Sequence, residues 1–238
     1  MTARPDATLS AGRRTLRLSI IVPVLDEAEA IAATLDALAT PRGLGHEVIV
    51  VDGGSGDETL AISRDHADMV IVGPRGRARQ MNAGAKHAHG DVLLFLHADT
   101  RLPPLGVERI ASAVAQGAAW GRFNVRIEGR SPMLAVVAAL MNVRSRLTGI
   151  ATGDQAMFVR RDLFERVGGF PDQPLMEDIE LSRRLRACAP PACLRERVVT
   201  SGRRWDNRGV WRTIVLMWRL RWRYWRGAAA DDLARAYR

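Results

Sequence analysis

The sequence predicts an α/β domain in which a mostly parallel central sheet is covered by helices. Short apolar runs alternate with helical stretches over about 110 residues, as right-handed β-α-β units require. Apolar residues make up 47% of the 238 residues, which is enough for a sizeable core. The apolar run at 92–96 passes straight into polar residues at 97–100. This change from apolar to polar residues is typical of a strand that is buried on both faces and ends at the edge where an open α/β sheet binds its ligands.

The first half of the chain supplies the alternating elements in order. The strand expected at 16–24 is followed by a helix at 28–39, because Ile31, Leu35 and Leu38 share one helical face. A turn at 41–45 then leads into a strand. The remaining elements are strands at 47–51, 69–72, 92–96 and 119–127, and helices at 57–66, 77–89 and 104–115.

The pattern changes after Gly129. We expect a mostly apolar helix at 132–147, a short strand at 157–159, and helices at 162–167 and 176–188. Since no repeat or linker separates two folding units, the second half should complete a cleft begun by the first. The chain then divides into a flexible leader (1–15), one domain (16–205) and a helical segment rich in tryptophan and arginine (206–238).

Charge and composition restrict the partners. The formal net charge is +9, and lysine is nearly absent, so arginine carries the positive charge. Arginine binds phosphate bidentately, which leaves nucleotides, nucleic acid and anionic lipid open as ligands. Cys188 and Cys193 fit reduced thiols in a cytoplasmic protein, because the N-terminus has no apolar secretory core. No uncharged run approaches the roughly 20 apolar residues of a transmembrane helix.

Acidic residues follow the first two strands at the edge where ligands bind. Asp26 and Glu27 come after the first strand and Asp52 after the second. Carboxylates there can accept hydrogen bonds from ribose hydroxyls or from a base N–H. Helix capping is the alternative for Asp26, and it is the favoured role for Asp57.

Two further acidic positions could take part in chemistry. Asp99, at the end of the strand at 92–96, could hold a divalent cation against phosphate oxygens. Alternatively, Asp99 caps a helix that starts near Pro103. The pair Glu177-Asp178 opens a predicted helix, where acids either complement the helix dipole or place a general base at a cleft.

Residues 52–56 form a glycine-rich loop, Asp-Gly-Gly-Ser-Gly, whose backbone N–H groups can approach a ligand closely. The loop resembles the first motif of S-adenosylmethionine-dependent methyltransferases, which are the alternative enzyme class. Against that class, the loop follows the second strand rather than the first. In addition, no acidic residue ends a strand about 20 residues later.

The stretch 76–84 begins a helix with arginines framed by glycines. Arg77 and Arg79 lie at the helix N-terminus, where the helix dipole also favours anions. Asn82 lies one turn later on the face of Arg79. A diphosphate would suit this position, and solvated surface arginines are the alternative.

The C-terminal segment has the composition of an interfacial amphipathic helix. Five of the six tryptophans lie between Trp205 and Trp225. A face of aromatic and aliphatic residues flanked by arginines is typical of contact with an anionic membrane surface, here through 210–226. Docking on the domain itself or on a partner subunit is the alternative. The face consists of Trp211, Ile214, Val215, Trp218, Trp222 and Trp225, flanked by Arg212, Arg219, Arg221, Arg223 and Arg226, with Leu216, Met217, Leu220 and Tyr224 behind.

Taken in order, these motifs resemble the family 2 glycosyltransferases, which have the GT-A fold. The resemblance covers about 16–205 and is closest to a group of small bacterial transferases described as radical-SAM/selenodomain-associated transferase 2. The matching stretches are SIIVPVLDE (19–27), VVDGGSGDET (50–59), GRARQMNAGA (76–85), LFLHADT (94–100), GDQAMFV (153–159), GGF (168–170), MEDIEL (176–181) and RRW (203–205).

The resemblance implies a site for a nucleotide-diphosphate sugar, with a UDP-sugar as the first expectation. One group of residues would surround the nucleoside, a second would lie near the diphosphate or sugar, and a third matches an element that closes over donor phosphates in processive relatives. The glutamine of that element is missing here, which argues against processivity. The groups are Pro23, Asp26, Glu27 and Asp52; Arg79 and Asn82; and Arg203, Arg204 and Trp205.

The resemblance also implies an acceptor side and a base. Gly153, Asp154 and Gln155 would lie beside the acceptor, and Asp178 of the Glu177-Asp178 pair would deprotonate the acceptor hydroxyl. The implied reaction is an inverting transfer to a hydroxyl acceptor, with no nucleic acid as partner and no indication of oligomeric state. A membrane-surface nucleotide-binding module with little catalysis is the alternative. We expect a cytoplasmic protein that can lie on the inner face of the cytoplasmic membrane.

The implied cofactor is Mn²⁺ or Mg²⁺, held through a D-x-D motif. Here the motif is His97-Ala98-Asp99, so that the first acid is a histidine. Histidine can ligate Mn²⁺ but suits Mg²⁺ poorly. Asp99 therefore carries the metal prediction, with His97 as a doubtful second ligand and Ala98 beside the nucleotide. The other histidines are predicted at the surface, and Met81 and Met157 in the core.

Overall fold

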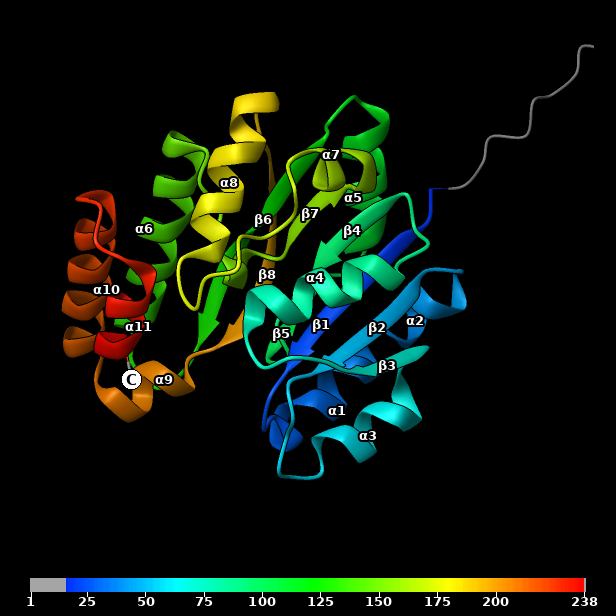
Figure 1. The fold of residues 1–238 in the computed structure, drawn as a ribbon, viewed down its shortest axis with the longest axis horizontal. Coiled ribbons are helices and arrows are strands. Elements are labelled where there is room, and N and C mark those ends of the chain that lie inside the picture. Colours follow the sequence, from blue (N-terminus) through cyan, green and yellow to red (C-terminus); the bar gives the residue numbers. More distant parts are fainter. Residues whose placement is uncertain (1–15, 238) are drawn as a thin grey trace, which may run out of the picture.

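The computed structural model describes residues 16–237, which form an eight-stranded sheet with helices on both faces (Figure 1). The leader predicted at 1–15 lies outside the described residues. The strand order is β3-β2-β1-β4-β7-β6-β8-β5. The strands are β1 (Leu18–Val24), β2 (Glu47–Asp52), β3 (Met69–Val72), β4 (Val92–Phe95), β5 (Thr100–Arg101), β6 (Trp120–Glu128), β7 (Met157–Arg160) and β8 (Ala192–Ser201).

The parallel half of the sheet confirms the prediction from sequence. β1 pairs in parallel with β2 on one side and with β4 on the other, and β2 pairs in parallel with β3. Every residue of β1, β2 and β4 is buried, which explains why these strands are unbroken apolar runs in the sequence. The register places Val24 opposite Asp52, so the loops that follow β1 and β2 begin side by side.

The other half of the sheet is mixed, where the alternation of elements predicted parallel strands. β7 runs antiparallel to both β4 and β6, and β8 runs parallel to β6 but antiparallel to the edge strand β5. The sequence does not predict β8, because Arg195, Glu196 and Arg197 interrupt its apolar pattern.

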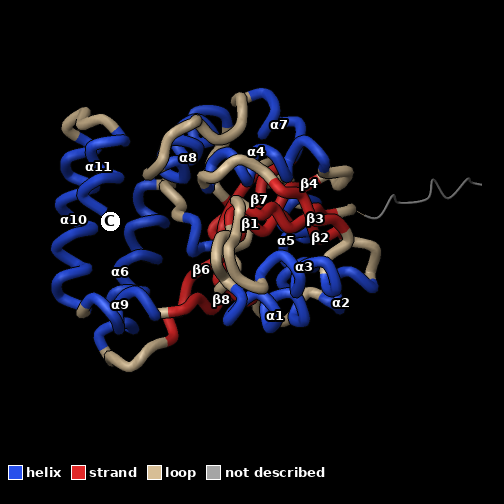
Figure 2. The backbone as a smooth tube through the Cα atoms, turned by 60° about the horizontal axis from the view of Figure 1, so that its bottom comes forward, coloured by secondary structure: helices blue, strands red, loops and turns tan. Residues whose placement is uncertain are grey.

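Helices cover the two faces of the sheet in separate layers (Figure 2). Side chains of α1, α5 and α6 contribute to one buried cluster, and those of α4, α7 and α8 to the other. The turn expected at 41–45 is mostly a short helix, α2. The helices are α1 (Ala28–Ala37), α2 (Ala39–Gly43), α3 (Thr59–His66), α4 (Arg77–His87), α5 (Gly106–Ala115), α6 (Met133–Thr148), α7 (Arg161–Arg166), α8 (Glu177–Cys188), α9 (Arg203–Arg208), α10 (Val210–Trp225) and α11 (Ala230–Tyr237).

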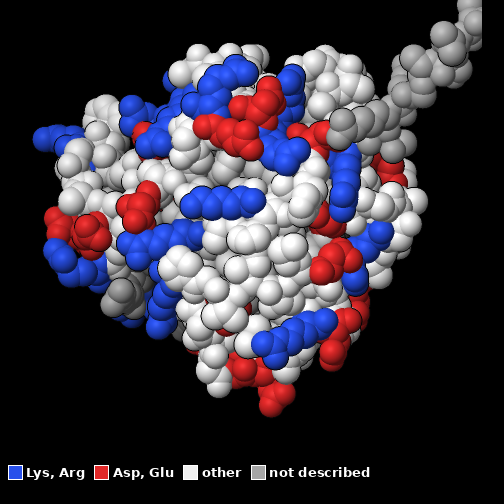
Figure 3. Space-filling model, turned by 45° about the vertical axis from the view of Figure 1, so that its right-hand side comes forward, with Lys and Arg blue, Asp and Glu red and all other residues white. Residues whose placement is uncertain are grey.

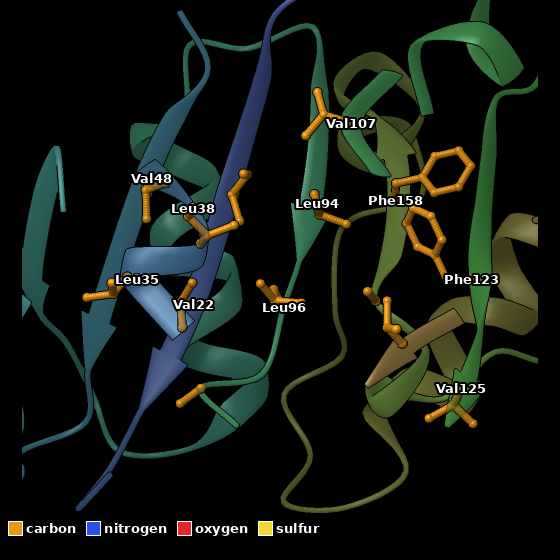
Figure 4. Close-up of a cluster of buried hydrophobic side chains, with 14 of the residues drawn as sticks. Val22, Leu35, Leu38, Val48, Leu94, Leu96, Val107, Phe123, Val125 and Phe158 are labelled. Atoms are coloured by element: carbon orange, nitrogen blue, oxygen red, sulfur yellow. The ribbon is translucent and has the colours of Figure 1, made fainter. Parts of the chain in front are cut away.

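The larger buried cluster joins the two halves of the sheet (Figure 4). Val22 of β1 and Leu94 of β4 lie on the same side of the sheet as Phe158 of β7 and Phe123 of β6. The rings of Phe123 and Phe158 have centroids 6.4 Å apart in an edge-on arrangement. On the opposite face, Phe95 packs edge-on against Phe170, with centroids 4.8 Å apart. β7 itself contributes Phe158 to the larger cluster and Met157 and Val159 to the second, so side chains pack on both of its faces.

The amphipathic helix predicted at 210–226 is confirmed as α10, and it forms a hairpin with α11, which the sequence did not separate within the helical segment 206–238. Leu220 of α10 and Leu233 of α11 are buried together with Met176, the residue that precedes α8. Figure 1 shows α6, α8, α10 and α11 gathered at the end of the molecule opposite β3 and α2. The hairpin thus packs directly against the start of α8, where the predicted base lies.

Candidate active site

The loops after β1 and β2 interlock through side-chain hydrogen bonds. The N–H of Asp26 donates to Ser55 Oγ (2.9 Å), and the N–H of Gly56 donates to Asp26 Oδ1 (2.8 Å). The N–H of Glu27 donates to Thr59 Oγ1 (2.8 Å). Asp26 has a φ of 52°, a conformation that these bonds hold in place. The loop after β2 therefore holds the backbone of Asp26 and Glu27, the two acids predicted on the donor side.

Asp52 and Asp57 organise that second loop. The Asp52 side chain is almost fully buried, and its Oδ2 accepts hydrogen bonds from the N–H groups of Gly54 and Ser55, both at 3.1 Å. The Asp57 carboxylate accepts bonds from the N–H of Ala28, the first residue of α1, and from Thr59, the first residue of α3. Asp57 thus bonds to the first N–H group of both helices, although the N-cap residues are Glu27 and Glu58.

Gln80 supports the site from α4, a role that the sequence does not predict. Its side chain is buried in α4, and Nε2 donates to the main-chain oxygens of Val24 (2.7 Å) and Val51 (2.8 Å). A Cβ atom on Gly53 would lie 3.1 Å from this amide. Gln80 therefore joins the ends of β1 and β2. In the sequence, the sign of this role is that Gln80 stands next to Met81, a residue predicted in the core.

Arg203 connects the end of β1 to Asp99. Its guanidinium lies 2.5 Å from Glu27 Oε2 and 3.9 Å from Asp99 Oδ2. The hydrogen bond that Arg203 donates to Glu27, with the nearby charge of Asp99, raises the pKa of Arg203. Asp99 is held in turn by a bond from Ser201 N–H to its main-chain oxygen (3.2 Å). These contacts gather three predicted donor-side residues.

The capping alternative for Asp99 is wrong. Helix α5 starts at Gly106 rather than near Pro103, because Leu105 adopts a left-handed conformation with a φ of 58°. No side chain caps this helix among the described residues. The Asp99 carboxylate instead faces Arg203 and is about one-quarter exposed, so it can reach a ligand.

His97 faces Asp154 in the predicted acceptor side. Its Nδ1 lies 3.3 Å from Asp154 Oδ1, and its Nε2 is buried without a hydrogen-bond partner among residues 16–237. A Cβ on Gly153 would lie only 2.3 Å from that Nε2, so a residue without a side chain is required at 153. The structure thus directs the imidazole toward the acceptor-side turn.

Within the described residues, no group of three or more His, Cys, Asp or Glu side chains could hold a metal ion. Asp99 offers a single carboxylate. Mg²⁺ and Mn²⁺ bound to nucleotides are often held by one or two carboxylates together with substrate phosphates. The residues therefore fit a cation that arrives with a diphosphate, and they do not fit an all-protein site.

The predicted base lies at the first turn of α8. Met176 has a φ of 66°, and this left-handed residue turns the chain into the helix. Asp178 Oδ2 accepts a hydrogen bond from Gly153 N–H (2.9 Å), and Oδ1 accepts one from Ile179 N–H (2.7 Å). The turn predicted on the acceptor side and the predicted base are therefore joined directly.

Glu177 is the buried member of the pair. Its side chain is 6% exposed and lies 4.0 Å from the guanidinium of Arg77. Burial, with the neighbouring charge of Asp178, raises the pKa of Glu177 despite Arg77. The Glu177 carboxylate is therefore costly to ionise in the folded protein.

Replacing Glu177 with Gln should stabilise the protein at high pH. An acid whose pKa is raised by folding contributes stability below its unfolded value of 4.5, and this contribution is lost as the pH rises through the folded value. The melting temperature of E177Q should therefore exceed that of wild type at pH 8, with the difference vanishing at pH 4. Thermal unfolding across this range measures it, with E165Q on the exposed surface of α7 as control. A difference independent of pH contradicts the prediction.

Several other predicted site residues make contacts that hold loops of the fold in place. Arg79 makes a two-pronged ion pair with Asp172 (2.6 and 3.0 Å), and Asn82 exchanges two hydrogen bonds with the main chain of Phe170. Both residues brace the loop after α7, whereas Arg77 faces the acids of the site. Gln155 is buried and its Oε1 accepts a bond from Thr152 N–H, so it holds the acceptor-side turn.

The remaining predicted residues are distributed around the site. Arg204 stacks on the ring of Tyr237 at 3.5 Å, and Trp205 packs against the larger buried cluster. Pro23 is buried in β1 opposite Val51. The carbonyl of Ala98 accepts a hydrogen bond from Thr34 Oγ1 (2.6 Å). Of the RRW element, Arg203 therefore lies with the donor-side acids and Arg204 with α11.

A sequence model of the family "Glycosyl transferase family 2" matches residues 19–168, more than half of the chain. This chain belongs to glycosyltransferase family 2. The matched region contains the interlocked loops after β1 and β2, Asp99 and the acceptor-side turn. Family membership removes the methyltransferase alternative.

Curated relatives of this family 2 member are longer proteins. A probable glycosyltransferase of Bacillus subtilis, YdaM, is 27% identical over 196 residues, which are 71% of this chain and 46% of YdaM. An undecaprenyl-phosphate 4-deoxy-4-formamido-L-arabinose transferase of Edwardsiella ictaluri is 28% identical over 111 residues, 42% of this chain and 34% of that protein. The chain spans less than half the length of these relatives.

Solved structures of glycosyltransferases share the fold. Residues 1–349 of S. aureus TarS, in complex with UDP-GlcNAc, superpose with a TM-score of 0.63 at 19% identity, over 78% of this chain and 58% of that fragment. The mannosyltransferase PcManGT of Pyrobaculum calidifontis, in complex with GDP-Man and Mn²⁺, gives a TM-score of 0.61 at 23% identity, over 94% and 70% of the two chains. The predicted GT-A fold is confirmed.

Proposed function

We propose that this family 2 member transfers a sugar from a nucleotide-diphosphate donor, most simply a UDP-sugar, to an acceptor hydroxyl with inversion. The observation that carries the proposal is the placement of Asp178. Its carboxylate accepts a hydrogen bond from Gly153 N–H at the acceptor-side turn. The same turn carries Asp154, which pairs with His97 and so connects the turn to the segment of Asp99. The solved relatives named above contain UDP-GlcNAc and GDP-Man, which supports a donor of this class.

On the donor side, the interlocked loops supply the contacts for a nucleoside. Asp26, Glu27 and Asp52 are held at the carboxyl ends of β1 and β2, where open α/β sheets bind ligands. Arg203 would move from Glu27 toward the diphosphate, because a doubly charged group attracts a guanidinium more strongly than one carboxylate. Asp99 would bind Mn²⁺ or Mg²⁺, which, when bound, neutralises charge on the leaving diphosphate.

The chemical step is a single displacement. The Asp178 carboxylate takes the proton of the acceptor hydroxyl, whose oxygen bonds to the anomeric carbon as the bond from that carbon to the diphosphate oxygen breaks. Each Asp178 oxygen has one backbone hydrogen bond and keeps a second lone pair for the proton. Arg203 stabilises the charge that develops on the departing nucleotide.

Donor binding should raise the melting temperature, because a ligand that binds only the folded state stabilises it by about 2.7 kcal/mol at 100 times its Kd. We expect a UDP-sugar to do so, more strongly with Mn²⁺ than without. Asp99→Asn should lose the part that depends on Mn²⁺, whereas D162N on α7 should keep it. If no nucleotide sugar shifts the melting temperature, the proposed function is wrong. Hydrolysis of the donor without acceptor separates the enzyme from a nucleotide-binding module.

We further propose that α10 lies on an anionic membrane surface. The exposed fractions of Trp211, Trp218, Trp222 and Trp225 range from 58% to 80%. Figures 1 and 2 show α6 beside α10, and α6 adds its own exposed row of Val136, Leu140, Val143 and Leu147. Arginines flank the tryptophans, which complements lipid phosphates.

Two further observations bear on the surface of the protein. Among the described residues, no helix combines the length and apolar character needed to cross a bilayer. On the face drawn in Figure 3, the described basic and acidic side chains are interspersed without a continuous basic track. A nucleic-acid-binding surface of the usual kind is therefore not visible on that face.

Vesicles test the membrane proposal. The protein should sediment with vesicles of phosphatidylglycerol and less with vesicles of phosphatidylcholine, and salt should weaken the binding. The double variant Trp218→Gln/Trp222→Gln should bind at least about tenfold more weakly, since two large apolar groups are lost. L44Q removes an exposed apolar side chain of similar exposure far from α10 and should bind as wild type does. Equal sedimentation of wild type and the double variant contradicts the proposal.

A further inference from the structure

Three arginines from three helices face the acceptor side of the site. Arg77 belongs to α4, Arg144 to α6 and Arg221 to α10. Each is within electrostatic reach of both Asp154 and Asp178. The sequence singles out Arg77 for an anion site at the start of a helix and places Arg221 alone on one side of the tryptophan face. It gives no role to Arg144.

Arg144 and Arg221 are partly buried and poorly paired for charged groups, whereas the Arg77 side chain is 52% exposed at the edge of the same region. Nε and Nη2 of Arg144 are buried without a hydrogen-bond partner among residues 16–237. Arg221 forms no ion pair or hydrogen bond within the same residues. Arg77 has one long contact, 4.0 Å, to the buried Glu177. Buried N–H groups normally have partners, so unpaired guanidinium atoms beside a substrate site indicate where a ligand binds.

Charge balance with the site acids does not explain this arrangement. Asp178 accepts its bonds from backbone N–H groups and Asp154 pairs with His97, so neither acid bonds to Arg144 or Arg221. Burial, with the nearby charge of Arg221, lowers the pKa of Arg144 to about 10. A pair of like charges held close together is stabilised by a bound anion.

We propose that Arg77, Arg144 and Arg221 form a second anion site, which holds a phosphate group carried by the acceptor. This inference rests on the proposed function and names its acceptor class: a phosphorylated molecule whose hydroxyl lies at Asp178. Guanidinium groups recognise phosphate through paired N–H donors, and three of them can surround it. The site is separate from the donor side, where Arg203 bonds to Glu27 and lies near Asp99.

The phosphate bound at this site could belong to a lipid or to a soluble molecule, and the position of α10 bears on the choice. Arg221 lies on α10, whose outer tryptophans are exposed, so a phosphate bound at Arg221 could belong to a lipid that reaches in from the membrane surface. A soluble phosphate ester would use the same guanidinium groups. Both sources share the chemistry, and they differ in whether an alkyl chain adds affinity.

Calorimetry tests this site with three probes: octyl phosphate, octanol and inorganic phosphate. The full chain is first saturated with UDP and Mn²⁺, so that the donor-side groups are occupied. Octyl phosphate should bind at least about tenfold more tightly than octanol, because charge-assisted hydrogen bonds contribute that much. Arg144→Gln and Arg221→Gln should each lose about tenfold in affinity for octyl phosphate. R146Q and R219Q, two residues away on the same helices and exposed, should bind as wild type does.

The outcomes separate the possibilities. Octyl phosphate binding more tightly than inorganic phosphate supports a lipid-type acceptor, and equal binding supports a soluble phosphate ester. Equal affinity for octyl phosphate and octanol, or unchanged affinity in both R144Q and R221Q, overturns the inference. Variants that keep the charge, Arg144→Lys and Arg221→Lys, should bind octyl phosphate with intermediate affinity. The rise in melting temperature caused by UDP shows that each variant is folded. If UDP-sugars bind and phosphate selectivity is absent, only this inference fails. If UDP-sugars do not bind, the proposed function fails.

Discussion

Replacement of Asp178 with Asn is expected to lower turnover by about two to four orders of magnitude, with the donor bound nearly as in wild type. The carboxylate would accept the proton of the attacking hydroxyl, and an amide at the same position cannot. The amide oxygen can still accept one of the two backbone hydrogen bonds, from Gly153 or Ile179. The turn and the helix start should therefore stay in place.

The measurement is transfer of radiolabelled sugar at saturating donor, together with calorimetric titration of UDP. Glu180→Gln is the matched control, because Glu180 lies on the same helix and pairs with Arg183 and Arg184 rather than facing the site. That variant should keep near-wild-type turnover. Unchanged turnover in D178N would exclude Asp178 as the base. Loss of UDP binding in D178N would show a structural role instead.

Truncation of Phe158 to Ala is expected to destabilise the fold by about 3–5 kcal/mol, as large-to-small substitutions of buried aromatic residues do. Phe158 is fully buried on β7, between β4 and β6, and its ring packs against Phe123. A Cβ on Gly121 would lie 2.5 Å from the Phe158 ring, so the ring fills its space tightly. Little relaxation is available to close the cavity.

Urea unfolding followed by circular dichroism gives this free energy. Val143→Ala on α6, where more than half of the side chain is exposed, should change stability by less than about 0.5 kcal/mol. A loss below about 1 kcal/mol for F158A would mean that the two halves of the sheet are not joined through this ring.

The sequence predicts the parallel half of the fold well, because β1, β2 and β4 are buried on both faces and local hydrophobicity reports this directly. The mixed half is harder. Arg195, Glu196 and Arg197 interrupt the apolar pattern of β8, and the antiparallel direction of β7 lies in its pairing with the distant strands β4 and β6 rather than in a local pattern. Direction and strand order are properties of contacts between distant segments.

The site shows the same division. Acids at strand ends are predictable, since the register of parallel strands brings Val24 next to Asp52. The partner of Arg79 is not, because Asp172 lies 93 residues away, and neither is the pairing of His97 with Asp154. Sequence motifs indicate which side chains carry chemistry, whereas tertiary contacts decide which of them are free to meet a ligand.

The pairing of β5 with β8 has a consequence for folding order. Thr100 lies opposite Thr200, and their hydroxyls are hydrogen-bonded at 2.9 Å across 100 residues of chain. Closing so long a loop is entropically expensive, and β5 contributes only two residues at the edge of the sheet. Asp99 and Arg203 flank this pairing, so we expect this part of the donor side to assemble late in folding and to open earlier than the central strands when the native state fluctuates.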